Sequence, residues 1–274
     1  MNLKTLRDTP PWEWPPDAGK TFHQTLTNRQ ATQADRILAA ELAGDFVVIN
    51  DELCEDLLTV VRDSSESPKL RATAAIAFGA ALEHAYTAGF DEMDDLDAPP
   101  ITEETFEKIQ ASLHALFLDE SNPKELRRRV LEASVRAQEE WHKEAVATAY
   151  KSSDREWKLT AVFCMRWIDG FDKQILEALE SKDQEIHVEA VHAAGNSEVK
   201  GAWRHVSDLI KRHGTPKPLL LAAVEAIGSI RPKEAKDMLL RLASSDDEEI
   251  SEAATDALSM LEPDDFEDFG GWVN

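Results

Sequence analysis

The side chains most able to do chemistry in this 274-residue chain are its histidines, cysteines and carboxylates. The sequence has no glycine-rich phosphate loop, no His-Glu-x-x-His motif, no Cys-x-x-Cys pair and no nucleophile elbow. His187 and His192 are five positions apart, whereas metal ligands on one helical face would be four apart. We therefore expect no catalytic residue, no metal ligand and no cofactor, and we expect that the protein is not an enzyme.

The two cysteines, Cys54 and Cys164, fall at apolar positions of predicted helices. We expect both to be reduced core residues, which favours a reducing compartment. No apolar run approaches the roughly 18–20 residues that span a membrane. The N-terminus leads into a Pro/Trp segment rather than an apolar signal core. The expected location is the cytoplasm, with no membrane partner.

Residues 10–16, PPWEWPP, could supply contact area to a partner. Prolines fix φ and favour an extended conformation at Trp14, and in an extended segment Trp12 and Trp14 point to the same side. Two such indoles could bury on the order of 300–500 Å². We expect residues 1–33 to form an N-terminal extension that caps the first helices. The alternative is a docking peptide for another protein.

Residues 263–274 form an acidic-aromatic C-terminal tail, which begins with a proline that ends the preceding helix. The acidic side chains favour solubility, while Phe266, Phe269 and Trp272 supply contact area. This composition is typical of a short recognition tail, and it equally allows a tail that folds back over the last repeat. The three aromatic residues are candidate partner-binding residues.

The densest basic cluster consists of Arg127, Arg128 and Arg129, and Arg136 follows seven positions after Arg129. Three consecutive residues on a helix spread over about 200°. We expect Arg127 to face the neighbouring repeat, and we take Arg128 and Arg129 as candidates for binding a partner's anion or carboxylate. The alternative is that the cluster balances the acidic residues beside it.

The formal net charge of −23 is unevenly distributed along the chain. Residues 86–125 hold 11 acidic and 2 basic residues, and residues 243–274 hold 11 acidic residues and no basic residue. These two segments carry −9 and −11, so the rest of the chain carries only −3. We expect no nucleic-acid partner, because nucleic-acid binding depends on Lys and Arg. The charge favours a protein partner with a basic or apolar segment, or simply solubility.

A six-fold repeat of one apolar pattern would position these side chains. In each copy a Leu, Ile or Trp is followed by a small or branched apolar residue four positions on and a small residue seven positions on. The first residues of the copies are 56, 31, 29, 33 and 31 positions apart. A period near 31 with two amphipathic helices per copy predicts an all-α fold, an α-solenoid superhelix of about six antiparallel helix pairs. The copies are Leu70-Ala74-Ala77, Leu126-Val130-Ala133, Trp157-Ala161-Cys164, Ile186-Ala190-Ala193, Leu219-Ala223-Ala226 and Ile250-Ala254-Ala257.

The turns between apolar stripes set the helix bounds. In the fourth unit we expect helices at 171–179 and 184–194, with Gly195 as a left-handed C-terminal cap. In the sixth unit we expect helices at 232–242 and 249–261. The small residue of each second helix is expected to be buried against its neighbour.

The long first interval contains 25 residues more than one period. This extra length falls near residues 87–104, which are rich in Asp and Glu, and it predicts an acidic loop insertion. Thr102, followed by two glutamates, predicts the start of the next helix.

The repeat resembles the HEAT-repeat family, including its short bacterial lyase-like branch. The resembling strings are residues 69–79 (KLRATAAIAFG), 186–195 (IHVEAVHAAG) and 221–228 (LAAVEAIG). The resemblance covers roughly residues 34–262. It is specific for the fold and says little about activity. Because the sequence has no catalytic motif, we expect a non-enzymatic interaction or assembly scaffold that binds a protein on the concave face lined by the second helices. The alternative is a bilin-lyase-like or other maturation enzyme acting in the same groove.

HEAT repeats usually have an arginine just after the first apolar residue of the second helix. Arg71 and Arg127 match this pattern, and Lys158 is close to it. The last three repeats depart from it, with His187, Leu220 and Ser251, so we expect an interrupted ladder of ion pairs in the C-terminal half. Deoxyhypusine hydroxylases resemble this repeat but carry His-Glu doublets that ligate iron. Here Val precedes Glu189 and Glu225, and Ser precedes Glu252, so the resemblance does not extend to an iron site.

Overall fold

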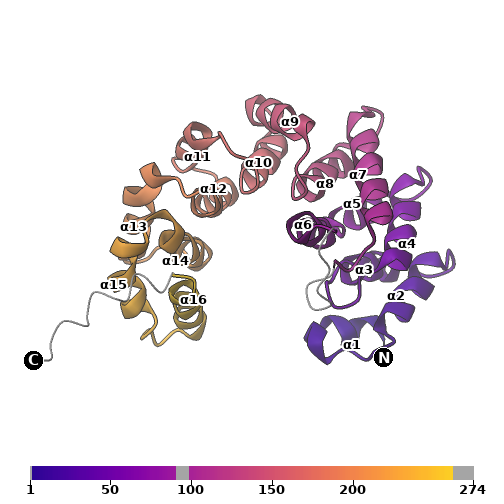
Figure 1. Ribbon diagram of the computed structural model, residues 1–274, viewed down its shortest axis with the longest axis horizontal. Coiled ribbons are helices and arrows are strands. Elements are labelled where there is room, and N and C mark those ends of the chain that lie inside the picture. Colours follow the sequence, from indigo (N-terminus) through magenta and orange to yellow (C-terminus); the bar gives the residue numbers. More distant parts are fainter. Residues whose placement is uncertain (1, 91–98, 262–274) are drawn as a thin grey trace, which may run out of the picture. The chain divides into compact units, whose positions relative to one another are not determined.

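The computed structural model describes residues 2–90 and 99–261. Within these ranges the regular elements are all helices, and they divide into two compact units, Met1–His142 and Lys143–Asn274. Each unit is built from helix pairs whose second helices pack against one another in chain order (Figure 1). This repeated packing confirms the predicted all-α solenoid.

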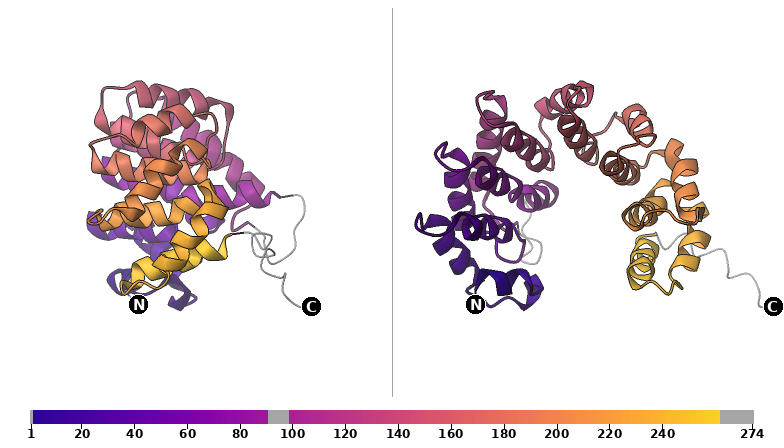
Figure 2. Two further views of the ribbon diagram at one scale, coloured as in Figure 1. Left: turned by 90° about the vertical axis from the view of Figure 1, so that its left-hand side faces the viewer. Right: turned by 180° about the vertical axis from the view of Figure 1, so that it is seen from behind.

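In the first unit the pairs are α2–α3, α4–α5 and α7–α8, and the second helices α3, α5 and α8 pack in sequence. The first helices α2, α4 and α7 form the other layer (Figures 1 and 2). The elements are α1 (Leu3–Arg7), η1 (Pro11–Glu13), α2 (Ala18–Thr27), α3 (Gln33–Ala43), α4 (Asp51–Arg62), α5 (Pro68–Ile76), α6 (Gly79–Ala88), α7 (Glu103–Leu118) and α8 (Lys124–Ser134).

In the second unit the helices α10, α12, α14 and α16 pack against one another in that order. Helices α11, α13 and α15 lie on the other side of this row, as the view from behind in Figure 2 also shows. The elements are α9 (Glu140–Lys151), α10 (Arg155–Cys164), α11 (Asp172–Ala178), α12 (Gln184–Asn196), η2 (Lys200–Ala202), α13 (Trp203–Lys211), α14 (Lys217–Ile230), α15 (Pro232–Leu242) and α16 (Glu248–Ser259).

The paired helices begin earlier than the sequence pattern indicated. Helices α2 and α3 pack as a pair that starts at Ala18, inside the segment 1–33 that we expected to be an extension. Helix α6 (Gly79–Ala88) packs against α8 and ends within the first residues of the insertion that we expected near 87–104. Residues 91–98 of this insertion lie outside the described residues.

Polar N-caps define where several helices begin. The Thr102 side chain accepts a hydrogen bond from the Thr105 backbone N–H, which confirms the predicted start of α7. Asp183 and Asp247 do the same for α12 and α16. These caps satisfy backbone donors that have no partner inside the helix.

Small residues allow the second helices to approach closely. Ala161, Ala190, Ala223 and Ala254 are all fully buried, as the repeat predicted. The expectation for Gly195 was wrong: α12 continues through it to Asn196, and the residue with a left-handed φ is Glu198, at 47°. A Cβ atom at position 195 would lie 2.7 Å from the Cα of Ala226. Gly195 therefore permits the contact between α12 and α14 and does not cap the helix.

Two buried arginines and a half-buried one link helices within the first unit. The Nε of each donates to a backbone carbonyl ten residues earlier, in the last turn of the preceding helix, where carbonyls lack an intrahelical partner. The three bonds are Arg36 to Leu26 (3.2 Å), Arg71 to Val61 (2.8 Å) and Arg127 to Phe117 (2.9 Å). These bonds hold the second helix of each pair against the first.

The second unit uses surface ion pairs between the starts of successive second helices. Arg155 at the start of α10 lies 2.5 Å from Asp183 and 2.6 Å from Glu185, both at the start of α12. Lys217 at the start of α14 binds Asp247, at 2.9 Å, and Glu249 at the start of α16. No such pair among the described residues joins the starts of α12 and α14. The ladder is thus interrupted and built from different positions than in the first unit.

Candidate functional site

The two N-terminal tryptophans lie in different environments. Residues Pro11–Glu13 form a 3₁₀ turn, closed by a 2.9 Å hydrogen bond from the Glu13 N–H to the Pro10 carbonyl. Trp14 itself has extended backbone angles, φ −66° and ψ 145°, as expected, whereas the turn before it means that the segment as a whole is not extended. Trp12 is 78% exposed, whereas Trp14 is half-buried.

Trp14 fastens the N-terminal segment to the first helices. Its Nε1 donates to the carbonyls of Leu6, at 2.8 Å, and Thr9, at 2.9 Å. Its ring packs edge-on against Phe22 of α2, with the centroids 5.4 Å apart. These contacts are those of an internal cap, and Trp12 has the more exposed indole of the two.

The candidate arginines Arg128 and Arg129 share one carboxylate. Arg128 is buried, and its Nη2 lies 3.8 Å from Oε1 of Glu132. Arg129 has a side chain that is 45% exposed, and its Nη1 lies 2.6 Å from Oε2 of the same residue. The two guanidinium groups therefore compensate the buried charge of Glu132. Arg128 is not positioned to meet an external anion.

The candidates Phe266, Phe269 and Trp272 lie outside the described residues.

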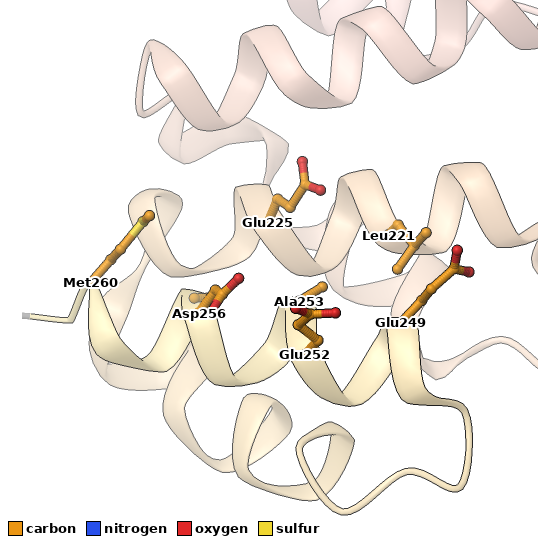
Figure 3. A pocket seen from close by; sticks show the side chains of 8 residues that line it. Leu221, Glu225, Glu249, Glu252, Ala253, Asp256 and Met260 are labelled. Carbon is orange, nitrogen blue, oxygen red and sulfur yellow. The ribbon is translucent and has the colours of Figure 1, made fainter. Parts of the chain in front are cut away.

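A groove between two neighbouring second helices of the second unit is a candidate site. It has a volume of about 500 Å³ and lies between α14 and α16 (Figure 3). Small and apolar side chains form part of its wall, and carboxylates form the rest. The lining residues are Leu221, Glu225, Glu249, Glu252, Ala253, Asp256, Ala257 and Met260.

The carboxylates of this groove are unequally compensated. At one end, Lys217 binds Glu249 and Asp247, and these pairs raise the pKa of the Lys217 ammonium and lower that of the Asp247 carboxyl. Further along α16, Glu252 and Asp256 have no ion-pair partner in the part of the chain that the structure describes. The groove therefore carries uncompensated negative charge along α16.

Glu225 of α14 adds a third carboxylate with incomplete compensation. Burial raises the pKa of its carboxyl, while the nearby Arg166 guanidinium opposes this shift. Its Oε2 lies 3.4 Å from Nδ1 of His192 on α12. Burial lowers the pKa of His192 to about 4, so this imidazole is neutral at pH 7 and does not neutralise Glu225.

The repeat register explains why these polar residues form a row. His192, Glu225 and Asp256 each lie six positions after the first residue of their copy, Ile186, Leu219 and Ile250 respectively. They therefore occupy equivalent positions on α12, α14 and α16. The repeat pattern was visible in the sequence, and this offset was the signal that could have identified the row.

A second polar contact joins His187 of α12 to His205 of α13, with 2.8 Å between their Nε2 atoms. The ring centroids are 5.0 Å apart, so the two nitrogens face each other almost head-on. A neutral imidazole donating to its neighbour explains this geometry. Among the described residues no group of three His, Cys, Asp or Glu side chains could hold a metal ion.

Both cysteines are buried and neither forms a disulfide, in agreement with their predicted core positions. Burial raises the pKa of the Cys54 thiol to about 12, so it is held as an unreactive thiol.

No helix in the described ranges combines the length and the apolar character that crossing a membrane requires.

Comparisons with known proteins show similarity of architecture only. No protein family matches the sequence, and no curated protein matches it. Among solved structures, the chain is similar to YibA of E. coli, with 17% identity over 94% of this chain and 85% of that chain and a TM-score of 0.44.

Two further solved structures are similar to a comparable degree. Human deoxyhypusine hydroxylase in complex with glycerol has 17% identity over 94% of this chain and 88% of that chain, with a TM-score of 0.40. A chain from the structure of Kap95p bound to RanGDP has 13% identity over 93% of this chain and 42% of that chain, with a TM-score of 0.39. The likeness is confined to HEAT-like helical repeats, and the fold class of this chain rests on its own helix packing.

Proposed function

We propose that this chain is a HEAT-type, non-enzymatic protein-binding module, and that the groove between α14 and α16 binds a basic polypeptide segment. The observation that carries the proposal is the uncompensated charge of Glu252 and Asp256 inside a groove of about 500 Å³. A partner with Lys or Arg side chains would supply the missing positive charge.

The apolar part of the groove supports a protein partner rather than a simple cation. Leu221, Ala253 and Ala257 line it, and Met260 is 82% exposed at one end. Met is an adaptable contact residue on binding surfaces, because its side chain is flexible and polarizable. The combination favours a segment that carries both basic and apolar side chains.

The same charge argues against nucleic acid as the partner. Residues 243–274 hold 11 acidic residues and no basic residue, and phosphate groups would be repelled by this end of the chain. No observation among the described residues favours the alternative of a maturation enzyme acting in this groove.

The direct test is fluorescence anisotropy of a labelled lysine- and arginine-containing peptide against the full chain at low ionic strength. An acidic peptide of equal length should not bind. The double variant Glu252→Gln/Asp256→Asn should weaken binding of the basic peptide at least fivefold, because it removes two charges from the groove.

The matched control is Asp246→Asn/Glu248→Gln, which removes the same charge from exposed residues that do not line the groove. It should change the affinity less than twofold. Equal losses in the two double variants would show that binding follows net charge alone, and the groove would then be excluded as the site.

A further inference from the structure

The contact between His187 on α12 and His205 on α13 has a geometry that a single shared proton can hold and that two protons cannot. We propose that this contact is a pH-sensitive switch, which is closed while at most one of the two imidazoles is charged and opens when both are charged. The proposal does not depend on the proposed function of the acidic groove.

His187 stands at a position where other repeats have a permanent cation. It directly follows the first residue of its copy of the repeat, as Arg71 and Arg127 do in theirs. Those two arginines keep their charge over the physiological pH range, and they donate to helix-end carbonyls. A histidine at the same position changes its charge between about pH 5 and pH 8. The repeat that contains α12 therefore has a titratable group in place of a fixed charge.

The two imidazole rings point at each other and not at a common third atom. Their Nε2 atoms are 2.8 Å apart and their centroids are 5.0 Å apart, which places the two nitrogens head-on. Two Nε2 ligands of one tetrahedral zinc ion would be about 3.3 Å apart, with their lone pairs converging on the metal. One proton between the nitrogens, donated by one ring and accepted by the other, accounts for the shorter distance.

Glu180, which follows α11, influences which charge states the pair tolerates. Its Oε1 lies 3.4 Å from Nδ1 of His205, so the carboxylate favours a proton on that nitrogen. In the neutral pair, Nε2 of His205 is then the acceptor and Nε2 of His187 is the donor. One further proton turns one ring into an imidazolium, whose charge Glu180 offsets, and a single proton still lies between the two Nε2 atoms.

A second added proton is incompatible with the contact. Both Nε2 atoms then carry a hydrogen, so neither can accept, and two cations face each other at hydrogen-bond distance. Burial lowers the pKa of the His187 imidazole, His205 and Arg212 act in the same direction, and Glu180 opposes them. The unfolded chain therefore binds this proton more readily. The contribution of His187 to stability is complete above its ordinary pKa of 6.5 and is lost as the pH falls through the lower pKa of the folded state.

The charged and titratable groups that face His187 come from two neighbouring segments. Glu180 lies just beyond α11, while His205 and Arg212 belong to α13 and its C-terminal end. Charged side chains on the helices that pack against α12 contact other residues, and these are Arg155 and Lys158 of α10, Glu177 of α11, and Lys217 and Glu225 of α14. The response of the contact to pH is therefore assigned to the pair and to Glu180.

The first test follows both imidazoles by NMR in the full chain labelled with ¹⁵N-histidine. Coupled sites titrate in steps that belong to the pair, so the resonances of His187 and His205 should report the same two midpoints. In His205→Gln, the affinity of His187 for a proton should be at least threefold higher than that of the second step in the wild type, because the neighbouring charge is absent. Glu180→Gln should lower the affinity of the first step at least threefold. Independent single-step titrations with midpoints unchanged in both variants would overturn the proposal.

The second test asks whether the second proton opens the contact. Hydrogen exchange of the α13 amides, corrected for the intrinsic effect of pH, is compared at pH 7.5 and at one pH unit below the second midpoint. Protection should fall at least fivefold in the wild type and less than twofold in His187→Gln/His205→Gln, in which the pair does not titrate. His213→Gln, which removes an exposed histidine just beyond α13, is the matched control and should follow the wild type. Unchanged protection in the wild type, or an equal fall in the double variant, would overturn the switch.

Discussion

The grooves of the two units differ in charge although both form beside second helices. The groove in the first unit, of about 400 Å³, is lined by Arg7 and Arg136 as well as by Glu41 and Asp45. The groove in the second unit, of about 500 Å³, is lined by carboxylates and by no basic side chain. The same kind of helix pair thus gives a groove of mixed charge in one unit and an acidic groove in the other, so the charge of a groove depends on its side chains and not on the fold.

The two units also use their basic residues differently. In the first unit Arg36 and Arg71 are buried and bind helix-end carbonyls, so they stabilise each pair from within. In the second unit Arg155 is half-exposed and bridges successive helices at the surface. The first unit therefore has arginines in its interior, whereas Glu252 and Asp256 in the groove of the second unit have no ion-pair partner among the described residues.

The largest predicted effect concerns the row of second helices that builds the acidic groove. Ala223 on α14 is fully buried, so Ala223→Arg forces a long charged side chain between helices. We expect the free energy of unfolding to fall by about 4 kcal/mol, from overpacking and charge burial together. Urea titration followed by circular dichroism measures it. Thr255→Arg, at an exposed position of α16, is the matched control and should change it by less than about 0.5 kcal/mol.

The buried His142 predicts that the free energy of unfolding falls by about 3 kcal/mol as the pH is lowered. This histidine belongs to the first unit. Its Nε2 lies 3.0 Å from the Ser134 hydroxyl, and its Nδ1 accepts the Glu139 N–H at 2.9 Å. Burial lowers its pKa from 6.5 to about 4. The unfolded chain therefore binds the proton more readily, so this contribution to stability is complete above pH 6.5 and is lost as the pH falls toward 4.

The measurement is the free energy of unfolding between pH 7 and pH 4.5 for the wild type and for His142→Gln. The variant should lose stability less steeply with falling pH, because it lacks this proton-binding group. His213→Gln, at an exposed histidine, should follow the wild type. Parallel curves for all three proteins would contradict the assignment to His142.

The N-terminal cap of the first unit gives a prediction of intermediate size. Trp14→Ala removes two hydrogen bonds and the packing on Phe22, so we expect a loss of about 2 kcal/mol. Trp12→Ala at the exposed neighbour should cost less than about 0.5 kcal/mol. Chemical unfolding monitored by circular dichroism distinguishes the two. Similar losses of stability in the two variants would mean that both tryptophans contribute to the cap. This would contradict their different degrees of burial.

The smallest effect tests whether the second unit's own lysine competes with a basic partner. Lys217→Met releases Asp247 and Glu249, so affinity for a basic peptide should rise about two- to threefold, a gain of the size of a surface ion pair. Lys211→Met, which removes the same charge from the exposed end of α13, is the control. An equal rise in both variants would attribute the effect to net charge.

The repeat pattern predicted much of this fold because burial imposes a period on the sequence. Buried Ala190 and Ala254 and the cap at Thr102 all follow from local patterns. The 3₁₀ turn at Pro11–Glu13 was missed, because proline is compatible with both extended and turn conformations. Two backbone hydrogen bonds, from Glu13 to Pro10 and from Trp14 to Pro11, close the turn, and residue types alone do not indicate them. Gly195 was misinterpreted because a close approach between helices cannot be read from one helix alone.

The candidate groove was harder to predict than the fold. The sequence showed that residues 243–274 are acidic, but abundant carboxylates do not indicate which ones gather. That Glu225 and Asp256 line the same groove follows only when α14 and α16 are known to be adjacent. The contact between His187 and His205 could not be predicted either, because the sequence analysis compared histidines within one helix. His205 lies on α13, and its position next to α12 is known only from the structure.

The position of the groove on α16 links recognition to folding. This last described helix packs on α14 and α15, and a solenoid in which each repeat contacts only its neighbours is most easily opened at a terminal repeat. A ligand that bridges α14 and α16 binds only while α16 is docked. At a concentration 100 times its dissociation constant it would stabilise the docked state by about 2.7 kcal/mol. The partner would then hold α16 reversibly in its docked state. Slower hydrogen exchange of the α16 amides would report that the partner is bound.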